Sequence, residues 1–318
     1  MVTYQPKNMV AVSFIRTADD VRAVKRLVLA ARSDVWVIAK LEKPQAVEHL
    51  EEILDVADGV MVARGDLGVE VPPEKVPIIQ KHVIRRAAEW RKPVITATQM
   101  LESMIENPRP TRAEASDVAN AIFDGTDAVM LSAETASGKY PREAVSIMSR
   151  IICEAETHMH DETLRRRHQK RQLSISETIC ESVAHAAQDL DMRAIAVYTE
   201  TGTTARLISK YRPASPIYAF ASSSTVCARL NLLWGVQPTL CGMESQTEDM
   251  VLTAERTLLK KHAVQAEDVI AIVAGTRTTS GSTNFMRLHV IGSVERQPHP
   301  EDRRKMQRLK PASAKKNG

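Results

Sequence analysis

The sequence has no apolar run long enough to span a membrane. A membrane-spanning helix needs about 18 consecutive apolar residues, and no stretch of this 318-residue chain reaches that length. The opening residues, MVTYQPKNMV, also lack the basic region and apolar run of a secretory signal peptide. We therefore expect a protein without a membrane partner.

Cysteine is scarce as well, which excludes a disulfide-rich scaffold. The four cysteines show no Cys-x-x-Cys spacing of the kind that redox and zinc sites use. Reduced, largely buried thiols are the simplest interpretation, and they are typical of a cytosolic protein. We expect a cytoplasmic location for the chain, whose cysteines are Cys153, Cys180, Cys227 and Cys241.

Outside its last residues, the chain has no excess of positive charge. Its net charge of +4 arises from the final twenty residues, which carry seven lysines and arginines against two acidic side chains. The rest of the chain is close to neutral, so we expect no nucleic-acid partner. Residues 296–318 hold little apolar content and predict a basic, disordered tail, with weak binding to an acidic partner as the alternative.

Short apolar runs alternate with helical patterns along the first half of the chain. Because these runs are apolar throughout, they predict a parallel sheet that helices cover on its faces. Thr111 with Glu114 forms a capping box, and Pro141 suits the first turn of a later helix. The predicted strands are 9–14, 35–42, 59–65, 92–99 and 127–134, and the predicted helices are 19–32, 44–57, 74–90 and 111–125.

A second α/β alternation begins near residue 174, after a strongly charged stretch. A chain of 318 residues is long enough for about two domains. The strands predicted in this half are 193–199, 215–220, 235–240, 268–275 and 287–292. We predict a first domain over 1–160, a charged linker over 161–173, a smaller α/β domain over 174–295 and the tail over 296–318.

Polar side chains recur where the strands of the first half end. In a parallel α/β sheet or barrel, the carboxyl ends of the strands lie at one edge, and catalytic groups gather there. A single polar residue at a strand end would carry little weight, but four consecutive strands share the feature. The side chains are Lys40 and Glu42, Arg64 and Asp66, Thr98 and Gln99, and Ser132 and Glu134.

Lys40 and Glu42 are spaced to act on one ligand. Two residues apart on a strand, their side chains point to the same side about 6–7 Å from each other. The lysine could contact a phosphate while Glu42, with Asp66 from the neighbouring strand, holds a divalent ion. Mg²⁺ suits such a pair, because it binds through one or two carboxylates and keeps several waters. A structural ion pair between Lys40 and Glu42 is the alternative, at a cost in desolvation.

The segment VARGDLGVEV, residues 62–71, has two interpretations. Glycine and aspartate after an apolar run usually mark a surface turn. At the edge of a parallel sheet, however, Gly65 would let backbone N–H groups approach an anion, and Asp66 would complete the metal pair. The spacing favours metal-assisted chemistry on a phosphorylated or carboxylated small molecule, without identifying that molecule.

Long strings of this sequence closely resemble pyruvate kinase of the bacterial type, from about residue 8 to residue 293. Ala133 is a mild departure, since many relatives have glycine there. The resemblance implies an α/β fold with strands four to eight of a (β/α)8 TIM barrel, because MVAVSF corresponds to the fourth strand, followed by a smaller α/β domain. The matching strings are IAKLEKPQAVEHLEEIL, DGVMVARGDLGVEVP, the run from KPVITATQMLESM through PTRAEASDVANA to MLSAETASGKYP, and GSTNFMRLHVIG.

The activity that the resemblance implies is transfer of a phosphoryl group from phosphoenolpyruvate to ADP. The products are pyruvate and ATP, in the last step of glycolysis. A family member is expected to use Mg²⁺ or Mn²⁺ together with K⁺ and to assemble as a homotetramer. In this reaction positioning and charge neutralisation dominate, which agrees with a site that has a lysine and carboxylates but no nucleophile.

The resemblance also implies roles for individual residues at the strand ends. Lys40 would neutralise the transferring phosphoryl group, and Glu42 and Asp66 would ligate the divalent metal. Thr98 would lie near the carbon that takes up a proton as the enolate becomes pyruvate. The remaining implied positions are the substrate-contacting backbone of Ala63, Arg64, Gly65 and Asp66, and a polar relay of Ser132 and Glu134.

In the second half, TETGTTA and GTRTTSGSTN resemble the effector-binding segments of the family. Hydroxyls and glycine N–H groups there could bind the phosphate of a sugar-phosphate or AMP effector. Many relatives carry arginine or serine where this chain has Thr203, and a plain turn at a helix start fits the same residues. The candidate positions are Thr199, Thr201, Gly202, Thr203, Thr204 and Gly281.

The resemblance does not extend to the first three barrel strands or to the lid domain that follows the third. In the family those parts carry K⁺ ligands, an arginine that binds the phosphate and much of the nucleotide site. We therefore expect little activity from the 318-residue chain by itself. The alternatives are a non-catalytic fragment that binds an effector or pairs with a full-length subunit, and another Mg²⁺-dependent barrel enzyme such as a carbon–carbon lyase.

Overall fold

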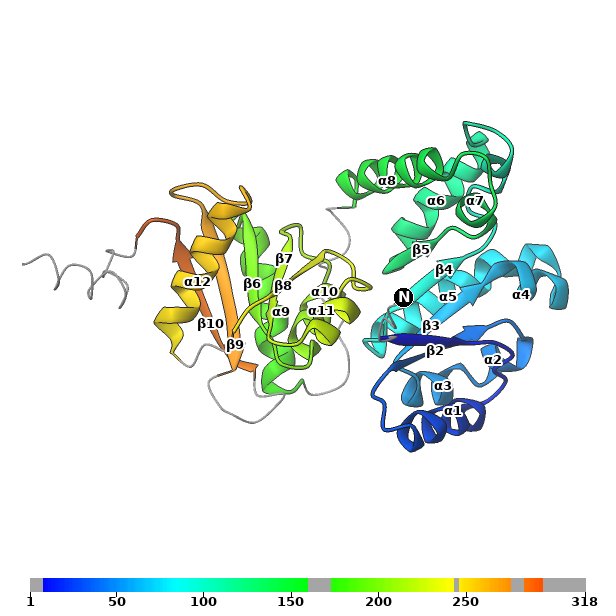
Figure 1. Ribbon diagram of the computed structural model, residues 1–318, viewed down its shortest axis with the longest axis horizontal. Helices are drawn as coiled ribbons and strands as arrows, with labels where there is room; N and C mark the ends of the chain where they lie inside the picture. Colours follow the sequence, from blue (N-terminus) through cyan, green and yellow to red (C-terminus); the bar gives the residue numbers. More distant parts are fainter. Residues whose placement is uncertain (1–7, 160–172, 243–245, 276–282, 294–318) are drawn as a thin grey trace, which may run out of the picture.

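The chain forms two α/β units, each around its own five-stranded sheet (Figure 1). The computed structural model describes residues 8–159, 173–242, 246–275 and 283–293. The predicted linker, except for its last residue, and the predicted tail lie outside these ranges. Within them, no helix is long and apolar enough to cross a membrane.

The first sheet is open and wholly parallel, and its strands pair in chain order. All five strands predicted for this half are present, but each ends earlier than predicted. The differences range from one residue in β2 to four residues in β5, which ends at Met130 and not at residue 134. Strands β1 and β5 are the edges, so the described residues do not close a barrel. The strands are β1 (Met9–Val12), β2 (Trp36–Leu41), β3 (Gly59–Ala63), β4 (Val94–Ala97) and β5 (Ala128–Met130).

Helices cover one face of this sheet, and the main core lies between them and the strands. Val37, Ala39 and Leu41 alternate along β2 to that face and share a buried cluster with Val21 and Ile53 from the helices. The helices are α1 (Ala18–Ala30), α2 (Pro44–Glu48), α3 (Leu50–Val56), α4 (Arg64–Glu70), α5 (Val76–Glu89), α6 (Arg112–Asp124), α7 (Ala133–Ala136) and α8 (Pro141–Thr157), with short 3-10 turns at Pro73–Lys75 and Glu102–Ile105.

The opposite, inner face carries a smaller apolar cluster. Ile38, Met61 and Ala97 are buried there, with Trp36 and Met130 packed against them and only partly buried. Because strand side chains alternate, Lys40 lies on the same face as Ile38, one step closer to the carboxyl end of β2. The inner face is therefore apolar along the strands and polar at its carboxyl-terminal edge.

Local sequence signals set the helix starts as predicted. Thr111 caps α6, and its hydroxyl accepts a hydrogen bond from the N–H of Glu114 at 3.2 Å. Pro141 is the first residue of α8, where its missing N–H costs nothing. The predicted helix over 44–57 is interrupted at His49, which separates α2 from α3.

The second unit is a mixed sheet in the order β10-β9-β6-β7-β8, with only β10 antiparallel to its neighbour. Its five strands confirm the prediction for this half, although β10 begins four residues earlier than expected. The elements are α9 (Ile175–Asp189), β6 (Ala194–Tyr198), α10 (Thr203–Lys210), β7 (Ile217–Ala221), α11 (Ser224–Leu230), β8 (Val236–Leu240), α12 (Thr247–Lys260), β9 (Val269–Gly275) and β10 (Thr283–Val290).

All four cysteines are free thiols, but the expectation that they are largely buried is only partly correct. Cys180 is buried in the core of the second unit, and burial raises the pKa of its thiol to about 12. Cys153, on α8, is exposed. The buried face of α8 is formed by Ala144, Met148 and Ala155, and Cys153 lies off that face.

The two units meet at the amino-terminal edge of the first sheet, through a buried carboxylate. Asp127 precedes β5 and is fully buried, with its Oδ2 2.5 Å from Nζ of Lys210 and its Oδ1 3.1 Å from Nη2 of Arg212. A second contact joins the same edge, where Nη2 of Arg229 lies 2.9 Å from Oδ1 of Asp34, just before β2. Side chains of the second unit thus neutralise acids at the start of the strands.

Burial would raise the pKa of the Asp127 carboxyl, but the charges of Lys210 and Arg212 outweigh it and lower that pKa. The same burial lowers the pKa of Lys210 to about 8, although Asp127 acts in the opposite direction. Asp127 and Lys210 therefore each need the other's charge to stay ionised where the two units meet.

We predict that Asp127→Asn destabilises the protein by about 3–5 kcal/mol, because it leaves two buried cations without their counter-charge. Asp19→Asn is the matched control, since Asp19 pairs with Arg22 at 2.8 Å on the surface and should contribute about 0–1 kcal/mol. Urea unfolding curves of the two variants and the parent give the comparison. Equal stabilities for the two variants would contradict the role of Asp127.

Candidate functional site

A cluster of Ser13, Lys40 and Glu42 lies at the carboxyl-terminal edge of the first sheet. The ammonium of Lys40 is 2.5 Å from Oε1 of Glu42 and donates to Oγ of Ser13 at 2.8 Å. Oε2 of Glu42 accepts the backbone N–H of Phe14 at 2.8 Å. The ion pair that the sequence left as an alternative is present, and the hydrogen bonds with Ser13 and Phe14 connect the ends of β1 and β2.

Glu42 keeps its negative charge in this setting although it is only 2 % exposed. Burial acts to raise the pKa of its carboxyl, but the hydrogen bonds from Lys40 and from the N–H of Phe14 outweigh burial and lower the pKa. Oε1 of Glu42 accepts from Lys40 and Oε2 accepts from the N–H of Phe14, and each carboxylate oxygen has two lone pairs. The carboxylate is thus anionic and still able to bind a cation.

Ser13 and Phe14 were not predicted as site residues, because the sequence analysis assigned them to the apolar strand 9–14. The strand ends at Val12, so Ser13 follows a strand end in the same way as Glu42 follows β2. Phe14 has φ of +61°, a left-handed conformation that a bulky residue rarely adopts. This backbone conformation directs the N–H of Phe14 toward Glu42. No pattern of residue types in the sequence predicts the conformation.

Asp66 lies in the first turn of α4, so the interpretation of residues 64–66 as a surface turn is wrong. Leu41 pairs with Val62 across β2 and β3, which puts Glu42 level with the end of β3 and on the same edge as Asp66. The Asp66 carboxylate is exposed, and no hydrogen bond or ion pair to another described residue involves it. It is therefore free to accept a ligand.

The carboxylates of Glu42 and Asp66 suit a divalent metal that needs only one or two protein ligands. Among the described residues, no three His, Cys, Asp or Glu side chains gather as a metal cage. Mg²⁺ does not need one, because it keeps several waters and binds through one or two carboxylates with substrate oxygens. The donor set of Glu42 and Asp66 fits Mg²⁺ or Mn²⁺ better than a metal that requires a full set of protein ligands.

Thr98 follows β4 at the same edge, and its hydroxyl is fixed from two sides. Oγ1 accepts the N–H of Gly65 at 2.8 Å and donates to the carbonyl of Ala97 at 2.6 Å. The approach of Gly65 to Thr98 leaves 3.4 Å between the Thr98 hydroxyl and a Cβ built on that glycine. The N–H of Gly65, one of the backbone groups expected to face a substrate anion, therefore already donates to Thr98.

Arg64 is buried, and its guanidinium bonds to the segment that follows β4. It donates to the carbonyls of Thr98 and Gln99 at 2.7 and 3.0 Å, and it is 2.6 Å from the carboxylate of Asp117. The side chain is therefore engaged within the protein. Any contact of Arg64 with a substrate would come from its backbone, as the resemblance implies.

Ser132 and Glu134 follow β5 and are held together by one contact. The buried carboxylate of Glu134 accepts the N–H of Ser132 at 2.7 Å with one oxygen and the N–H of Leu101 at 3.2 Å with the other. The hydroxyl of Ser132 has no hydrogen-bond partner within the described ranges. Glu134 thus connects the segments after β4 and β5.

The segment after β4 is also tied to α6 through Glu114. Its carboxylate accepts the N–H and hydroxyl of Ser103 at 2.7 and 2.6 Å and the N–H of Thr111 at 2.7 Å. Burial acts to raise the pKa of Glu114, but these hydrogen bonds outweigh it and lower the pKa below 4.5. The anionic form of Glu114 is therefore the form that stabilises this segment.

We predict that Glu114→Gln lowers the free energy of unfolding by about 1 kcal/mol at neutral pH, since an amide oxygen cannot accept all these hydrogen bonds. The pKa of Glu114 is lowered in the folded state. The advantage of glutamate is therefore complete at pH values above its ordinary pKa of 4.5 and disappears as the pH falls through the folded pKa. Urea unfolding from about pH 7 to about pH 3 measures it. A difference between the two proteins that does not change with pH would contradict this assignment.

The candidate effector residues gather between β6 and α10. The hydroxyl of Thr199 accepts the N–H of Gly202 at 2.9 Å, and the hydroxyls of Thr201 and Thr203 are 3.0 Å apart. Gly202 has φ of +87°, which favours glycine, and it caps α10. The hydroxyl of Thr204 bonds to that of Thr283 at 2.6 Å, a partner that was not singled out from the sequence, while Gly281 lies outside the described residues.

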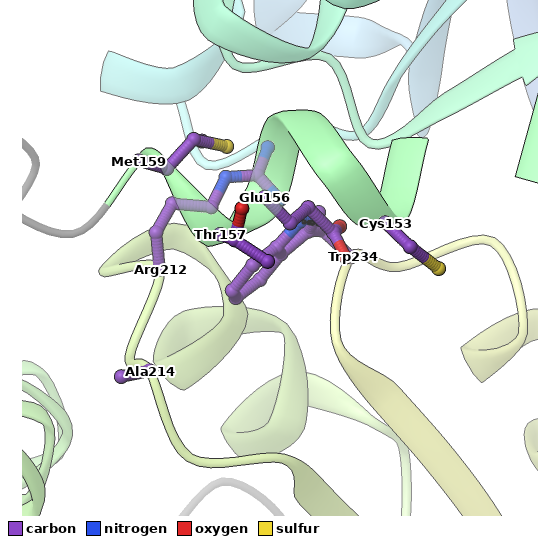
Figure 2. Close-up of a pocket in the computed structure, with 7 residues that line it drawn as sticks. All are labelled: Cys153, Glu156, Thr157, Met159, Arg212, Ala214 and Trp234. Atoms are coloured by element: carbon purple, nitrogen blue, oxygen red, sulfur yellow. Dashed lines mark hydrogen bonds between the residues drawn. The ribbon is translucent and has the colours of Figure 1, made fainter. Parts of the chain in front are cut away.

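A cavity of about 260 Å³ lies at the joint between the units and not at the polar edge (Figure 2). Figure 2 shows the side chains of Arg212 and Trp234 beside α8, and the indole N–H of Trp234 donates to Glu156 at 2.8 Å. Since Arg212 pairs with Asp127, this cavity belongs to the opposite edge of the sheet from Glu42. It contains none of the predicted site residues.

Comparisons with known proteins agree on one family. The family model described as "Pyruvate kinase, barrel domain" matches residues 3–145, and "Pyruvate kinase, alpha/beta domain" matches residues 177–289. The chain is 47% identical over 292 residues to "Pyruvate kinase" of Bacillus licheniformis, covering 91% of this chain and 50% of that protein. It is 47% identical over 290 residues to "Pyruvate kinase" of Geobacillus stearothermophilus, covering 90% of this chain and 49% of that protein. The chain spans about half the length of the curated relatives that it matches.

Proposed function

We propose, on the premise that this chain belongs to the pyruvate kinase family, that the carboxyl-terminal edge of its first sheet takes part in phosphoryl transfer from phosphoenolpyruvate to ADP. One observation carries the proposal. Glu42 is a buried carboxylate kept anionic at this edge, in contact with Lys40 and on the same edge as the free carboxylate of Asp66. A cation and two carboxylates in this arrangement suit a polyanionic substrate that arrives with a divalent metal.

Lys40 would neutralise the charge that develops on the transferring phosphoryl group. An ammonium has three N–H donors, and Ser13 and Glu42 account for two of them at 2.8 and 2.5 Å. The third donor is available for a phosphoryl oxygen. Because Ser13 and Glu42 hold the ammonium from two strands, little of its freedom would be lost when the substrate binds.

Glu42 and Asp66 would hold Mg²⁺ or Mn²⁺, with substrate oxygens and water completing the ligand set. Bound there, the metal would supply positive charge next to the phosphoryl and carboxylate oxygens of the substrate. The contact between Lys40 and Glu42 keeps the carboxylate ionised, so this residue is ready to ligate at neutral pH. We assign no residue of this chain to K⁺.

Thr98 would lie beside the carbon that accepts a proton as the enolate becomes pyruvate. Its hydroxyl has a defined direction, because it accepts from Gly65 and donates to Ala97. Glu134 would position Ser132 near this point through the backbone N–H that it accepts at 2.7 Å. The two residues would then form the polar side of the path that the proton takes.

The proposal can be tested on the part of the reaction that needs neither ADP nor a phosphoryl group. The site should stabilise the enolate of pyruvate, so it should remove a methyl proton of pyruvate and return a deuteron from D₂O. We predict that the chain with Mg²⁺ accelerates loss of the methyl signal of pyruvate in proton NMR spectra. Thr98→Val should slow this exchange on the order of a hundredfold.

Thr178→Val is the matched control, since it makes the same chemical change at an exposed position of α9 in the second unit and should leave the exchange rate unchanged. Exchange no faster than with Mg²⁺ alone would contradict the proposed role of this chain. Turnover of phosphoenolpyruvate with ADP is expected to be low for these 318 residues, because the resemblance assigns the phosphate-binding arginine to a part of the family that they do not match.

A second candidate, a module that pairs with another polypeptide, is favoured by the open sheet. Strands β1 and β5 each have one neighbour among the described strands, and unpaired strand edges readily pair with other chains. Trp36 and Met130 on the inner face are only partly buried. Absence of pyruvate exchange together with co-purification of the chain with a full-length pyruvate kinase subunit would favour this module over the enzyme.

A further inference from the structure

The segment that follows β4 has a conformation that its own residues do not favour. Thr98 and Gln99 both have left-handed backbones, with φ of +69° and +53°. Neither residue is glycine, and a β-branched threonine is especially disfavoured in this region. Two consecutive residues of this kind persist only where surrounding contacts impose the conformation.

The side chain of Arg64 makes contacts that could impose it. Its Nη2 donates to the carbonyl of Thr98 at 2.7 Å and to the carbonyl of Gln99 at 3.0 Å, and its Nε donates to the Thr98 carbonyl at 3.2 Å. Nη2 is also 2.8 Å from the sulfur of Met100. One guanidinium therefore bonds to three consecutive residues.

Arg64 is itself held by residues on two helices. Its Nη1 is 2.6 Å from the carboxylate of Asp117 on α6 and donates to Oε1 of Gln80 on α5 at 3.3 Å. The amide of Gln80 donates in turn to Asp124 at 3.0 Å. Arg64 is only 6 % exposed, so water competes little for these bonds.

The register of the sheet puts Arg64 beside the segment that it binds. Ala63 pairs with Ala97, so Arg64 and Thr98 are the first residues beyond the paired ends of β3 and β4. The backbone N–H of Gly65, the next residue, donates to the hydroxyl of Thr98. Side chain and backbone of this short stretch thus bind Thr98 from both ends, through its carbonyl and through its hydroxyl.

We propose that Arg64 is a positioning residue, whose guanidinium holds Thr98 and Gln99 in their left-handed conformation and so directs the Thr98 hydroxyl. Arg64 acts through Thr98 and does not touch the substrate with its side chain. Lysine cannot replace it, because an ammonium is a compact point charge and lacks the planar fork that bonds to two carbonyls and a carboxylate at once. The catalytic consequence rests on the proposed function, whereas the effect on backbone conformation does not.

The test compares Arg64→Met and Arg64→Lys with Arg91→Met as the matched control. Arg91 is also a largely buried arginine, paired with Glu177 at 2.8 Å, and it has no contact with Thr98. The first measurement is the Cα and Cβ chemical shifts of Thr98 and Gln99 in the full chain labelled at threonine and glutamine, because these shifts depend on φ and ψ. We expect the left-handed shifts to be lost in both Arg64 variants and kept in Arg91→Met.

The second measurement is the exchange of pyruvate methyl protons with D₂O. We expect the limiting rate to fall at least about tenfold in both Arg64 variants, with the half-saturating pyruvate concentration changed less than about twofold. Loss of folded protein alone would also lower the limiting rate without changing the half-saturating concentration. The rate is therefore expressed per folded chain, with the folded fraction taken from the same NMR spectra. If Arg64→Met does not fold, Arg64→Lys, which keeps the charge beside Asp117, provides the same comparison.

Unchanged shifts at Thr98 and Gln99 in the folded Arg64 variants would overturn the proposal, and so would altered shifts with an unchanged exchange rate. If the parent chain shows no exchange at all, the proposed function fails for this chain. The chemical shifts would then still decide whether Arg64 holds the segment. The two failures are therefore distinguishable.

Discussion

In-register pairing of parallel strands brings the polar side chains of the first unit together. The other features of this unit depend on the same pairing. Val12 pairs with Ala39, so the residues that follow them, Ser13 and Lys40, lie side by side. A slip of one residue would turn Lys40 to the helix-covered face. The same pairing collects the residues that precede the strands at the opposite edge, where Asp127 binds the second unit. One edge carries the candidate chemistry and the other joins the two units.

Much of this arrangement could be predicted from the sequence, because its signals are local. Apolar runs separated by helical patterns identified all ten strands, and the capping box of Thr111 and Glu114 marked the start of α6. Lys40 and Glu42 were predicted to share a face because they are two residues apart on a strand. Their roles toward substrate and metal were inferred from this spacing and from the resemblance to pyruvate kinase, and they stay predictions.

Other features could not be predicted, because they depend on partners far away in the chain or on unfavourable backbone conformations. Phe14 contributes an N–H to Glu42 only because its φ is +61°, and no propensity of phenylalanine indicates this. The bonds from Arg64 to Thr98 span 34 residues. Asp127 was predicted only as the first residue of the strand 127–134, and its burial depends on side chains of the second unit.

The most direct test of the central claim, that Glu42 and Asp66 form the metal-binding pair of this edge, is to locate bound Mn²⁺ by its paramagnetic broadening of amide NMR signals. The prediction is strong broadening at Phe14, Glu42 and Asp66 at low Mn²⁺ concentrations, with the signals of Asp34 and Asp127 at the opposite edge unaffected. Competition by Mg²⁺ should restore the broadened signals. Broadening centred on other acidic side chains, with the signals of Glu42 and Asp66 unchanged, would contradict the claim.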